Sequence, residues 1–303
     1  LVTVPETAAA VTQSFVVNDV DDSQLSYVVT EQTGYGTFAI EPNTPFSIDG
    51  QQVVTWSYQV DETAVAVLDI GDQVTENIVL TISDAQAAAD VVSVNVIIEG
   101  ANNDPIITGG LSMGITEDEH RTSSQINAND VDGDAVLSWF WIDTQLGKVA
   151  QLDGTYGSVT INTSTGDWTY NQTTSITADL LADEAVEDVF KVRVLDEQGA
   201  FVETLVTINI TGLNDAPTDI AINSYNLVEN IDTTDDVYIG AITVADVDGN
   251  NVLSLSATTV FTLKNDDELY VKAGQVIDYE QYASYNVTVT ATDQNDGTTY
   301  SQV

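Results

Sequence analysis

The stretch Ile208-Asn209-Ile210-Thr211-Gly212-Leu213-Asn214-Asp215-Ala216-Pro217 determines how the chain is divided. Its first half alternates apolar and polar residues, as a half-buried strand does, and its second half is a polar turn that ends in proline. A similar turn, Asn102-Asn103-Asp104-Pro105, occurs earlier in the chain. If Asn103 is aligned with Asn214, the two turns lie 111 residues apart. A strand and turn that recur at such a distance predict tandem domains.

Further landmarks keep this spacing. The offset of 111 also relates Glu6 to Glu117, and Asp19-Val20-Asp21 to Asp130-Val131-Asp132. An offset of 112 relates Trp56 to Trp168 and Asp84 to Asp196. After Pro217 a divergent third unit shows Glu229, Asp246-Val247-Asp248 and Asp293 in the same order. We therefore predict three domains, at residues 1–104, 105–215 and 216–303.

Within each unit the apolar residues follow the period of a strand. Residues 91–98, 205–210 and 285–290 alternate with period two, and Asp-Gly pairs at Asp49, Asp132, Asp153, Asp248 and Asp296 mark turns. One short helix or turn is expected between Thr177 and Val189. Short strands and frequent turns over about 100 residues are typical of an immunoglobulin-like sandwich. The fold class predicted is all-β, with three sandwiches arranged end to end.

The charge of the chain excludes several functions. There are 48 acidic residues against 6 basic ones in 303 residues, which gives a net charge of −42. Six scattered cations do not form a surface for nucleic acid or for an anionic membrane. No cysteine is present, which excludes disulfides and thiolate metal sites, and His120 is the only histidine. The repulsion between the acids is screened either by solvent and salt, as on a halophilic surface, or by divalent cations.

No targeting or membrane-spanning segment is expected, because no apolar run approaches 18 residues. The chain begins at Leu1 without a methionine. We interpret it as a segment of a longer protein.

Units one and two resemble the VCBS repeats of large bacterial adhesins. The resemblance is carried by Leu152-Asp153-Gly154-Thr155-Tyr156-Gly157, Gly166-Asp167-Trp168-Thr169-Tyr170, Asp188-Val189-Phe190-Lys191-Val192 and the stretch that ends in Pro217. Unit three resembles a cadherin domain through Val228-Glu229-Asn230, Asp246-Val247-Asp248-Gly249-Asn250, Asp278-Tyr279-Glu280 and Ala291-Thr292-Asp293. The chain is therefore similar to the tandem VCBS and cadherin-like repeats of calcium-dependent, RTX-type surface adhesins.

The resemblance implies several Ca2+ ions, held mainly at the interdomain junctions by oxygen ligands from both domains and the linker. For the first junction it implies Glu6, Asn103, Asp104, Asp130, Asp132 and Asp196, with Asp72 close by. For the second it implies Glu117, Asp183 or Glu184, Asn214, Asp215, Asp246, Asp248 and Asp293. Asp19, Asp21 and Asp84 at one end of the chain, and Glu229, Asp278 and Glu280 at the other, are half-sites. The alternative is that the Asn-Asp and Asp-Gly pairs only form turns.

Other polar and aromatic features have simpler explanations. Alternation places Trp139 and Trp141 on one face of a strand, where they belong to the core or, alternatively, form a platform that binds a sugar ring. His120 is expected in a solvated loop. The acidic run at residues 266–268 is expected in an exposed hairpin turn.

Three classes of function follow from these features. The first is a calcium-rigidified extender or adhesive segment of a bacterial surface protein, involved in cell or surface adhesion and biofilm formation. The second is a carbohydrate- or peptide-binding module on the same scaffold. The third is an enzyme, which we do not expect, because acids that recur in every unit suit a repeated metal site better than a single catalytic cleft. We expect a secreted, monomeric segment, anchored to the outer membrane through other parts of the protein. Its partners would be neighbouring repeats and surface glycans or proteins, without nucleic acid or membrane insertion.

Overall fold

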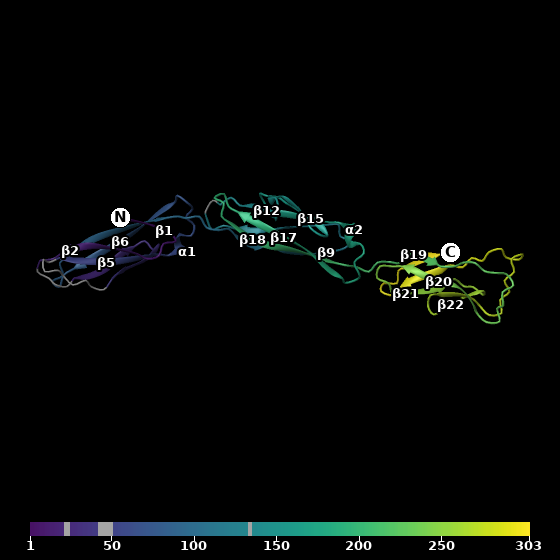
Figure 1. Cartoon of the computed structure of the whole chain (residues 1–303). Coiled ribbons are helices and arrows are strands. Elements are labelled where there is room, and N and C mark those ends of the chain that lie inside the picture. Colours follow the sequence, from purple (N-terminus) through teal and green to yellow (C-terminus); the bar gives the residue numbers. More distant parts are fainter. Residues whose placement is uncertain (21–24, 42–50, 133–134) are drawn as a thin grey trace.

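The chain forms three β-sandwiches that follow one another along a single axis (Figure 1). The structure is a computed structural model and describes residues 1–20, 25–41, 51–132 and 135–303. The two termini lie in different terminal domains, and the middle domain contacts both of its neighbours (Figure 1). Within the described residues, none of the helices has the length and apolar character needed to cross a bilayer. The prediction of an all-β chain of end-to-end sandwiches is confirmed.

Domain one packs a four-stranded sheet, ordered β1-β7-β6-β3, against a three-stranded sheet, ordered β2-β5-β4. Its first strand pairs parallel with its last strand, and a short helix follows β5. The elements are β1 (Val2–Pro5), β2 (Val11–Asn18), β3 (Ser26–Gln32), β4 (Gly36–Ile40), β5 (Gln51–Val60), α1 (Glu62–Val65), β6 (Gln73–Ser83) and β7 (Ala89–Glu99).

Domain two repeats this plan with a five-stranded sheet, β13-β12-β17-β18-β9, a four-stranded sheet, β10-β16-β15-β14, and the pair β11-β8. Again an early strand, β9, runs parallel to the last one, β18. The elements are β8 (Ile106–Gly109), β9 (Ser112–Thr116), β10 (Arg121–Gln125), β11 (Asn127–Asn129), β12 (Ser138–Asp143), β13 (Gly147–Val149), β14 (Gln151–Asp153), β15 (Gly157–Ile161), β16 (Asp167–Gln172), α2 (Thr174–Thr177), β17 (Ala185–Leu195) and β18 (Phe201–Thr211).

Domain three has the sheets β19-β20-β23-β22 and β21-β24-β25. The elements are β19 (Asp219–Ile222), β20 (Val237–Ala245), β21 (Asn251–Leu255), β22 (Phe261–Lys264), β23 (Glu268–Val271), β24 (Val289–Asp293) and β25 (Thr299–Gln302).

The period-two segments are strands for the reason predicted: alternate side chains enter the core. The expected strands at 91–98 and 205–210 lie within β7 and β18. The third, at 285–290, is a strand only from Val289. Of the short helix or turn expected between Thr177 and Val189, the structure has turns, since the helical turn α2 ends at Thr177 and β17 begins at Ala185. The acidic run at 266–268 lies at the turn between β22 and β23, where Asn265 and Asp266 have positive φ.

Trp139 and Trp141 belong to the core of domain two and do not form a sugar-binding platform. Their exposed fractions are 8% and 0%. The ring of Trp141 meets Trp168 edge to face, with 6.1 Å between the ring centroids. Because both indoles are covered by the opposite sheet, neither offers a flat face on which a sugar could stack.

Each of the first two domains contains a buried carboxylate that holds a loop in place. In domain two Asp188 accepts hydrogen bonds from the backbone N–H groups of Thr155 (2.7 Å) and Tyr156 (3.0 Å), and from the Tyr170 hydroxyl (2.8 Å). The loop approaches so closely that a Cβ on Gly154 would lie 2.6 Å from the Asp188 carboxylate. Burial and this hydrogen bond raise the pKa of Tyr170 far above its ordinary value.

Domain one has the same arrangement around Glu76, which is fully buried. Its carboxylate accepts from the backbone N–H groups of Thr33, Gly34 and Tyr35 at 2.5–2.9 Å, and from the Tyr58 hydroxyl at 3.0 Å. These bonds give the backbone N–H groups of the loop an acceptor and tie the loop to the core. The two carboxylates therefore have a structural role, which is distinct from that of the acids at the domain junctions.

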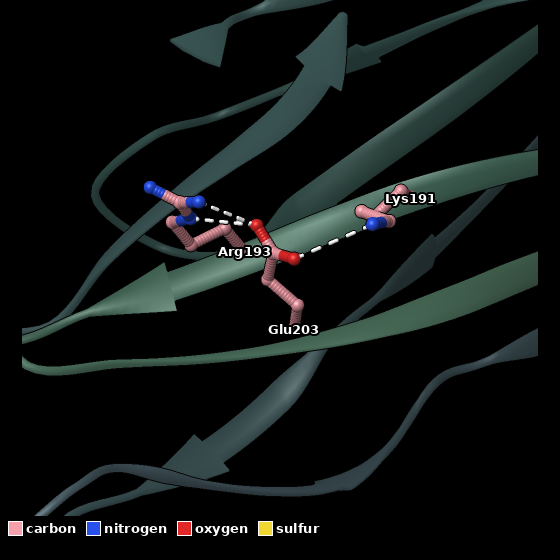
Figure 2. A network of polar contacts seen from close by, with 3 residues as sticks. All are labelled: Lys191, Arg193 and Glu203. Carbon is pink, nitrogen blue, oxygen red and sulfur yellow. Dashed lines mark hydrogen bonds and ion pairs between the residues drawn. The ribbon is translucent and has the colours of Figure 1, made fainter. Parts of the chain in front are cut away.

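Two basic residues of β17 in domain two, Lys191 and Arg193, pair with Glu203 of the neighbouring strand β18. Glu203 accepts from Arg193 at 2.6 and 2.9 Å, and lies 3.4 Å from the Lys191 ammonium (Figure 2). These partners, chiefly the hydrogen bonds from Arg193, hold the pKa of Glu203 below its usual range. Arg193 also stacks over Phe201, with 3.9 Å between the guanidinium carbon and the ring centroid. Because the group is partly exposed, it contributes about 0–1 kcal/mol to folding.

Candidate metal centres at the two domain junctions

The first junction gathers acids from both domains around the linker. Glu6 directly follows β1 of domain one. From domain two, Asp130 and Asp132 follow β11, and Asp196 follows β17. Glu6, Asp132 and Asp196 are buried, although each lies at a pole of its own sandwich.

The linker amides connect these acids. The Asn103 side-chain nitrogen lies 3.0 Å from the Asp132 carboxylate, 3.3 Å from the backbone carbonyl of Ala66 and 3.5 Å from the Glu6 carboxylate. The Asn102 side chain donates to Asp196 at 2.8 Å. The Asn103 nitrogen therefore occupies a position surrounded by oxygen atoms from both domains.

The second junction has the same hydrogen-bond pattern. The Asn214 side chain donates to Asp293 at 2.6 Å, and the Asp215 backbone N–H donates to Asp248 at 2.6 Å. Glu117 accepts from the Leu213 backbone N–H. Asp248 also accepts from the backbone N–H of Ala182 in domain two, so its carboxylate contacts both sides of the junction. Asp246 turns inward and caps its own loop, accepting from Asp248 N–H at 3.0 Å.

These bonds correct the alignment of the two linkers by one residue. The side chain of Asn102 has the role of the Asn214 side chain, since each donates to the Asp at the end of the penultimate strand of the next domain. Asn103 therefore corresponds to Asp215, and the true offset at the linker is 112 rather than 111. Asp104 then corresponds to Ala216, and it is exposed to solvent.

Several buried oxygen atoms at the junctions have no hydrogen-bond partner within the described residues. At the first junction they are Glu6 Oε2, Asp130 Oδ2 and Asn102 Oδ1. At the second they are Glu117 Oε2 and Asp215 Oδ2. A buried carboxylate oxygen without a donor is costly unless a cation accompanies it. These atoms are hard oxygen ligands of the kind that Ca2+ prefers, so the residues present fit the metal that the sequence predicted.

The same crowding raises the pKa of three of these acids. Burial is the main cause for Glu6, Asp130 and Asp215. Neighbouring acids add to the effect: Asp132 raises the pKa of both Glu6 and Asp130, and Glu117 raises that of Asp215. Like charges are thus held close together at both junctions.

Some members of these clusters were not found from the sequence. Asp179, just after α2, raises the pKa of Asp215, and Glu62, in α1, raises that of Glu6. Asn295 donates to the Asn214 side-chain oxygen at 2.7 Å. By contrast, Glu184 accepts from Leu181 N–H within its own loop, and Asp72 likewise accepts from Asp69 N–H. Asp183 has a positive φ of 64° and stands where domain one has Gly71.

No group of three or more acidic or histidine side chains converges as a ready-made metal site within the described ranges. The carboxylates instead point toward amide donors of the linker, which separate like charges. Any ion bound here would therefore draw its ligands from Asn side chains and backbone carbonyls as well as from acids.

The acids at the ends of the chain are less organised. Asp84 caps its hairpin by accepting from Ala88 N–H at 2.8 Å, and Asp278 accepts from Gln281 N–H at 3.1 Å. Glu229 and Glu280 are exposed, and Asp19 is half-buried. Asp21 lies outside the described residues. These acids therefore differ from the buried acids of the internal junctions.

Comparison with known proteins supports the fold. Residues 102–212 match the family described as the bacterial cadherin-like domain. Over 99% of its length the chain superposes on 72% of the first four extracellular cadherin domains of protocadherin gamma B7, with a TM-score of 0.60 and 19% identity. It also superposes, over 96% of its length, on 89% of domains 22–24 of mouse cadherin-23, with a TM-score of 0.51 and 18% identity. A search of curated proteins gave no match. The chain thus has the architecture of tandem cadherin repeats, and its middle domain is similar to bacterial members of that class.

The raised pKa values predict an unusual response to pH. Without calcium, Glu6, Asp130 and Asp215 bind protons more tightly in the folded protein than in the unfolded chain. Stability of the calcium-free protein should therefore rise as the pH falls through the window between these raised pKa values and the ordinary carboxyl pKa values. Glu203, whose pKa is lowered, titrates below this window and does not offset the gain.

With calcium bound, stability should instead fall as the pH falls, because protonation of the ligands releases the metal. Melting curves of calcium-free and calcium-loaded protein at several pH values test this prediction. If the melting temperature changes with pH in the same way with and without calcium, the junction acids are not calcium ligands.

Proposed function

We propose that this chain is a calcium-rigidified extender segment of a bacterial cell-surface adhesin, in which metal at the two internal junctions fixes one sandwich to the next. The observation that carries the proposal is the set of buried, unpartnered oxygen atoms at both junctions, supplied by two domains and a linker in the same pattern. A cation would neutralise these acids and bind both domains at once. Its absence leaves a short linker between like-charged poles, which repel.

Calcium suits this role better than magnesium. It accepts six to eight oxygen ligands with flexible geometry, whereas magnesium requires a near-ideal octahedron. The ligands proposed for the first junction are Glu6, Asn102, Asn103, Asp130, Asp132 and Asp196. Those proposed for the second are Glu117, Asp179, Asn214, Asp215, Asp248 and Asp293.

The biological setting is also part of the proposal. A rod of end-to-end domains suits a protein that holds an adhesive tip away from the cell. The repeated acids and the VCBS-like and RTX-type resemblance of the sequence favour a secreted or outer-membrane-anchored adhesin that acts in surface attachment and biofilm formation. A non-enzymatic role agrees with acids that recur at structural junctions.

A calcium titration by isothermal calorimetry tests the proposal with a matched pair of variants. Glu117→Gln removes one buried charge from the second junction but keeps the shape of the side chain. We expect its affinity at that junction to fall about tenfold or more, since the lost charge interaction exceeds about 1.4 kcal/mol. Asp104→Asn removes the same charge from the exposed position next to the first linker and should leave affinity unchanged.

Equal loss in both variants would show that calcium responds only to the overall charge of the surface. The competing function, a carbohydrate-binding module, predicts binding on a glycan array by calcium-loaded protein. The rod proposal predicts none for this segment alone.

A further inference from the structure

The two junctions differ in the side chain at one linker position. Four carboxylates of each junction occupy equivalent positions: Glu6, Asp130, Asp132 and Asp196 at the first, and Glu117, Asp246, Asp248 and Asp293 at the second. Asn103 and Asp215 are the equivalent linker residues, because the backbone N–H of Asn103 donates to Asp132 and that of Asp215 donates to Asp248. The first junction therefore has a neutral amide where the second has a carboxylate.

The side-chain amide of Asn103 connects the two domains without a metal. Its nitrogen donates to the Asp132 carboxylate of domain two at 3.0 Å and to the Ala66 carbonyl of domain one at 3.3 Å. It also lies 3.5 Å from the Glu6 carboxylate of domain one. Because an amide nitrogen carries two N–H donors, it brings partial positive charge to these oxygen atoms and partly takes the place of a cation.

Asp215 cannot take this role, because a carboxylate has no proton to donate. Its Oδ2 atom is buried and has no hydrogen-bond partner among the described residues. Glu117 Oε2 is in the same state, on a side chain that is 4% exposed. The second junction therefore has one more negative charge in its linker than the first, and it lacks the side-chain donor that Asn103 supplies there.

Charge and competition both favour calcium binding at the second junction. The affinity of a calcium site increases with the number of charged ligands, and Asp215 adds one. At the first junction a cation must also displace the hydrogen bonds of Asn103 before it can bind the same oxygen atoms. Acids outside the matched sets do not reverse the difference, since Asp118 and Asp179 act on Asp215 while Glu62 acts at the first junction.

On the basis of the proposed function, we infer that calcium fills the two junctions in order, the second at a concentration about tenfold or more below the first. Asp215 sets the higher affinity of the second junction, and Asn103 sets the lower affinity of the first. Between the two midpoints, domains two and three form one stiff unit. Domain one is then held by Asn103 and by the hydrogen bond from the Gln198 side chain to Asp69, at 3.1 Å. The rod therefore stiffens in two steps as calcium rises.

Hydrogen exchange of the 303-residue chain, measured by mass spectrometry during a calcium titration, reports on each junction separately. Residues 101–104 report on the first linker and residues 212–215 on the second. Exchange should slow in each segment as metal fixes the linker N–H groups to their carboxylate acceptors. We expect the midpoint for residues 212–215 to lie at about tenfold or more lower calcium than that for residues 101–104. Strands β15 and β16 of domain two are the internal reference and should not change.

Two substitutions of matched shape exchange the difference between the junctions. Asn103→Asp adds the missing charge and removes the competing donor, so it should lower the calcium midpoint of the first junction to that of the second. Asp215→Asn should raise the midpoint of the second junction toward that of the first. Asp104→Asn changes the charge of the exposed residue beside the first linker and should move neither midpoint.

The outcomes separate this inference from the proposed function. A single midpoint for both linkers, or midpoints that neither Asn103→Asp nor Asp215→Asn moves, would overturn the order of filling and leave calcium binding at the junctions intact. A lower midpoint at the first linker would also contradict the order. If calcium slows exchange at neither linker, both the order and the proposed function are wrong.

Discussion

Removal of calcium is expected to lower the melting temperature of domain two by about 10–20 °C. Extracellular calcium sites have dissociation constants of about 10⁻⁴–10⁻³ M. At about 100 times the dissociation constant, one site adds about 2.7 kcal/mol to stability by mass action. For a domain of this size each kcal/mol shifts the melting temperature by about 4–8 °C. Domain two should respond most, since it contributes ligands to both junctions.

Tryptophan fluorescence makes this measurement specific. Trp139, Trp141 and Trp168 report on domain two, Trp56 reports on domain one, and domain three has no tryptophan. Magnesium at the same concentration is the control for ionic strength and nonspecific screening. An unchanged domain-two transition in calcium-free buffer would refute the claim that the junctions bind calcium.

The second large effect is expected from Asp188→Ala, which should destabilise domain two by about 4 kcal/mol. The substitution leaves the N–H groups of Thr155 and Tyr156 and the Tyr170 hydroxyl without their acceptor. Each buried polar group left unpaired costs about 1–3 kcal/mol. Because a domain is stable by only about 5–15 kcal/mol, much of the folding free energy would be lost.

Two variants act as controls in urea unfolding followed by tryptophan fluorescence. Glu187→Ala changes an exposed acid on the same strand and should cost less than about 0.5 kcal/mol. Tyr170→Phe removes one of the three donors and should cost about 1 kcal/mol. If Asp188→Ala costs no more than Glu187→Ala, the buried carboxylate does not hold the loop.

Much of the fold follows from the sequence because its signals are periodic. Alternation over residues 91–98 and 205–210 places every second side chain in the core. This pattern does not depend on the type of turn that joins the strands. Residues 285–288 alternate in the same way, yet the strand β24 begins only at Val289. Between Thr177 and Val189 the pattern left a short helix or a turn open, and the structure has turns before β17 begins at Ala185.

The sequence predicted which acids lie near each junction, but it aligned the two linkers one residue out of register. Asp130, Asp132 and Asp196 are placed by strand ends, whose positions the repeat defines. The linker has no such support, and Asn102-Asn103 can be aligned with Asn214 in two ways. The hydrogen bonds to Asp196 and Asp293 decide between them. Asp179 was missed because a single acid within a loop carries no motif. Glu76 was missed for the same reason, although its counterpart Asp188 lies 112 residues later in the sequence.

Small-angle X-ray scattering of the 303-residue chain, with and without calcium, tests the central claim most directly. With calcium, the wild-type protein should have the maximum dimension of a straight rod of three domains (Figure 1). Without calcium, it should show a broader distribution of distances, because the like-charged poles are no longer joined. Asp215→Ala should loosen only the second junction in calcium, while Asp104→Ala behaves as wild type. An identical distance distribution of the wild type in both conditions would contradict the account.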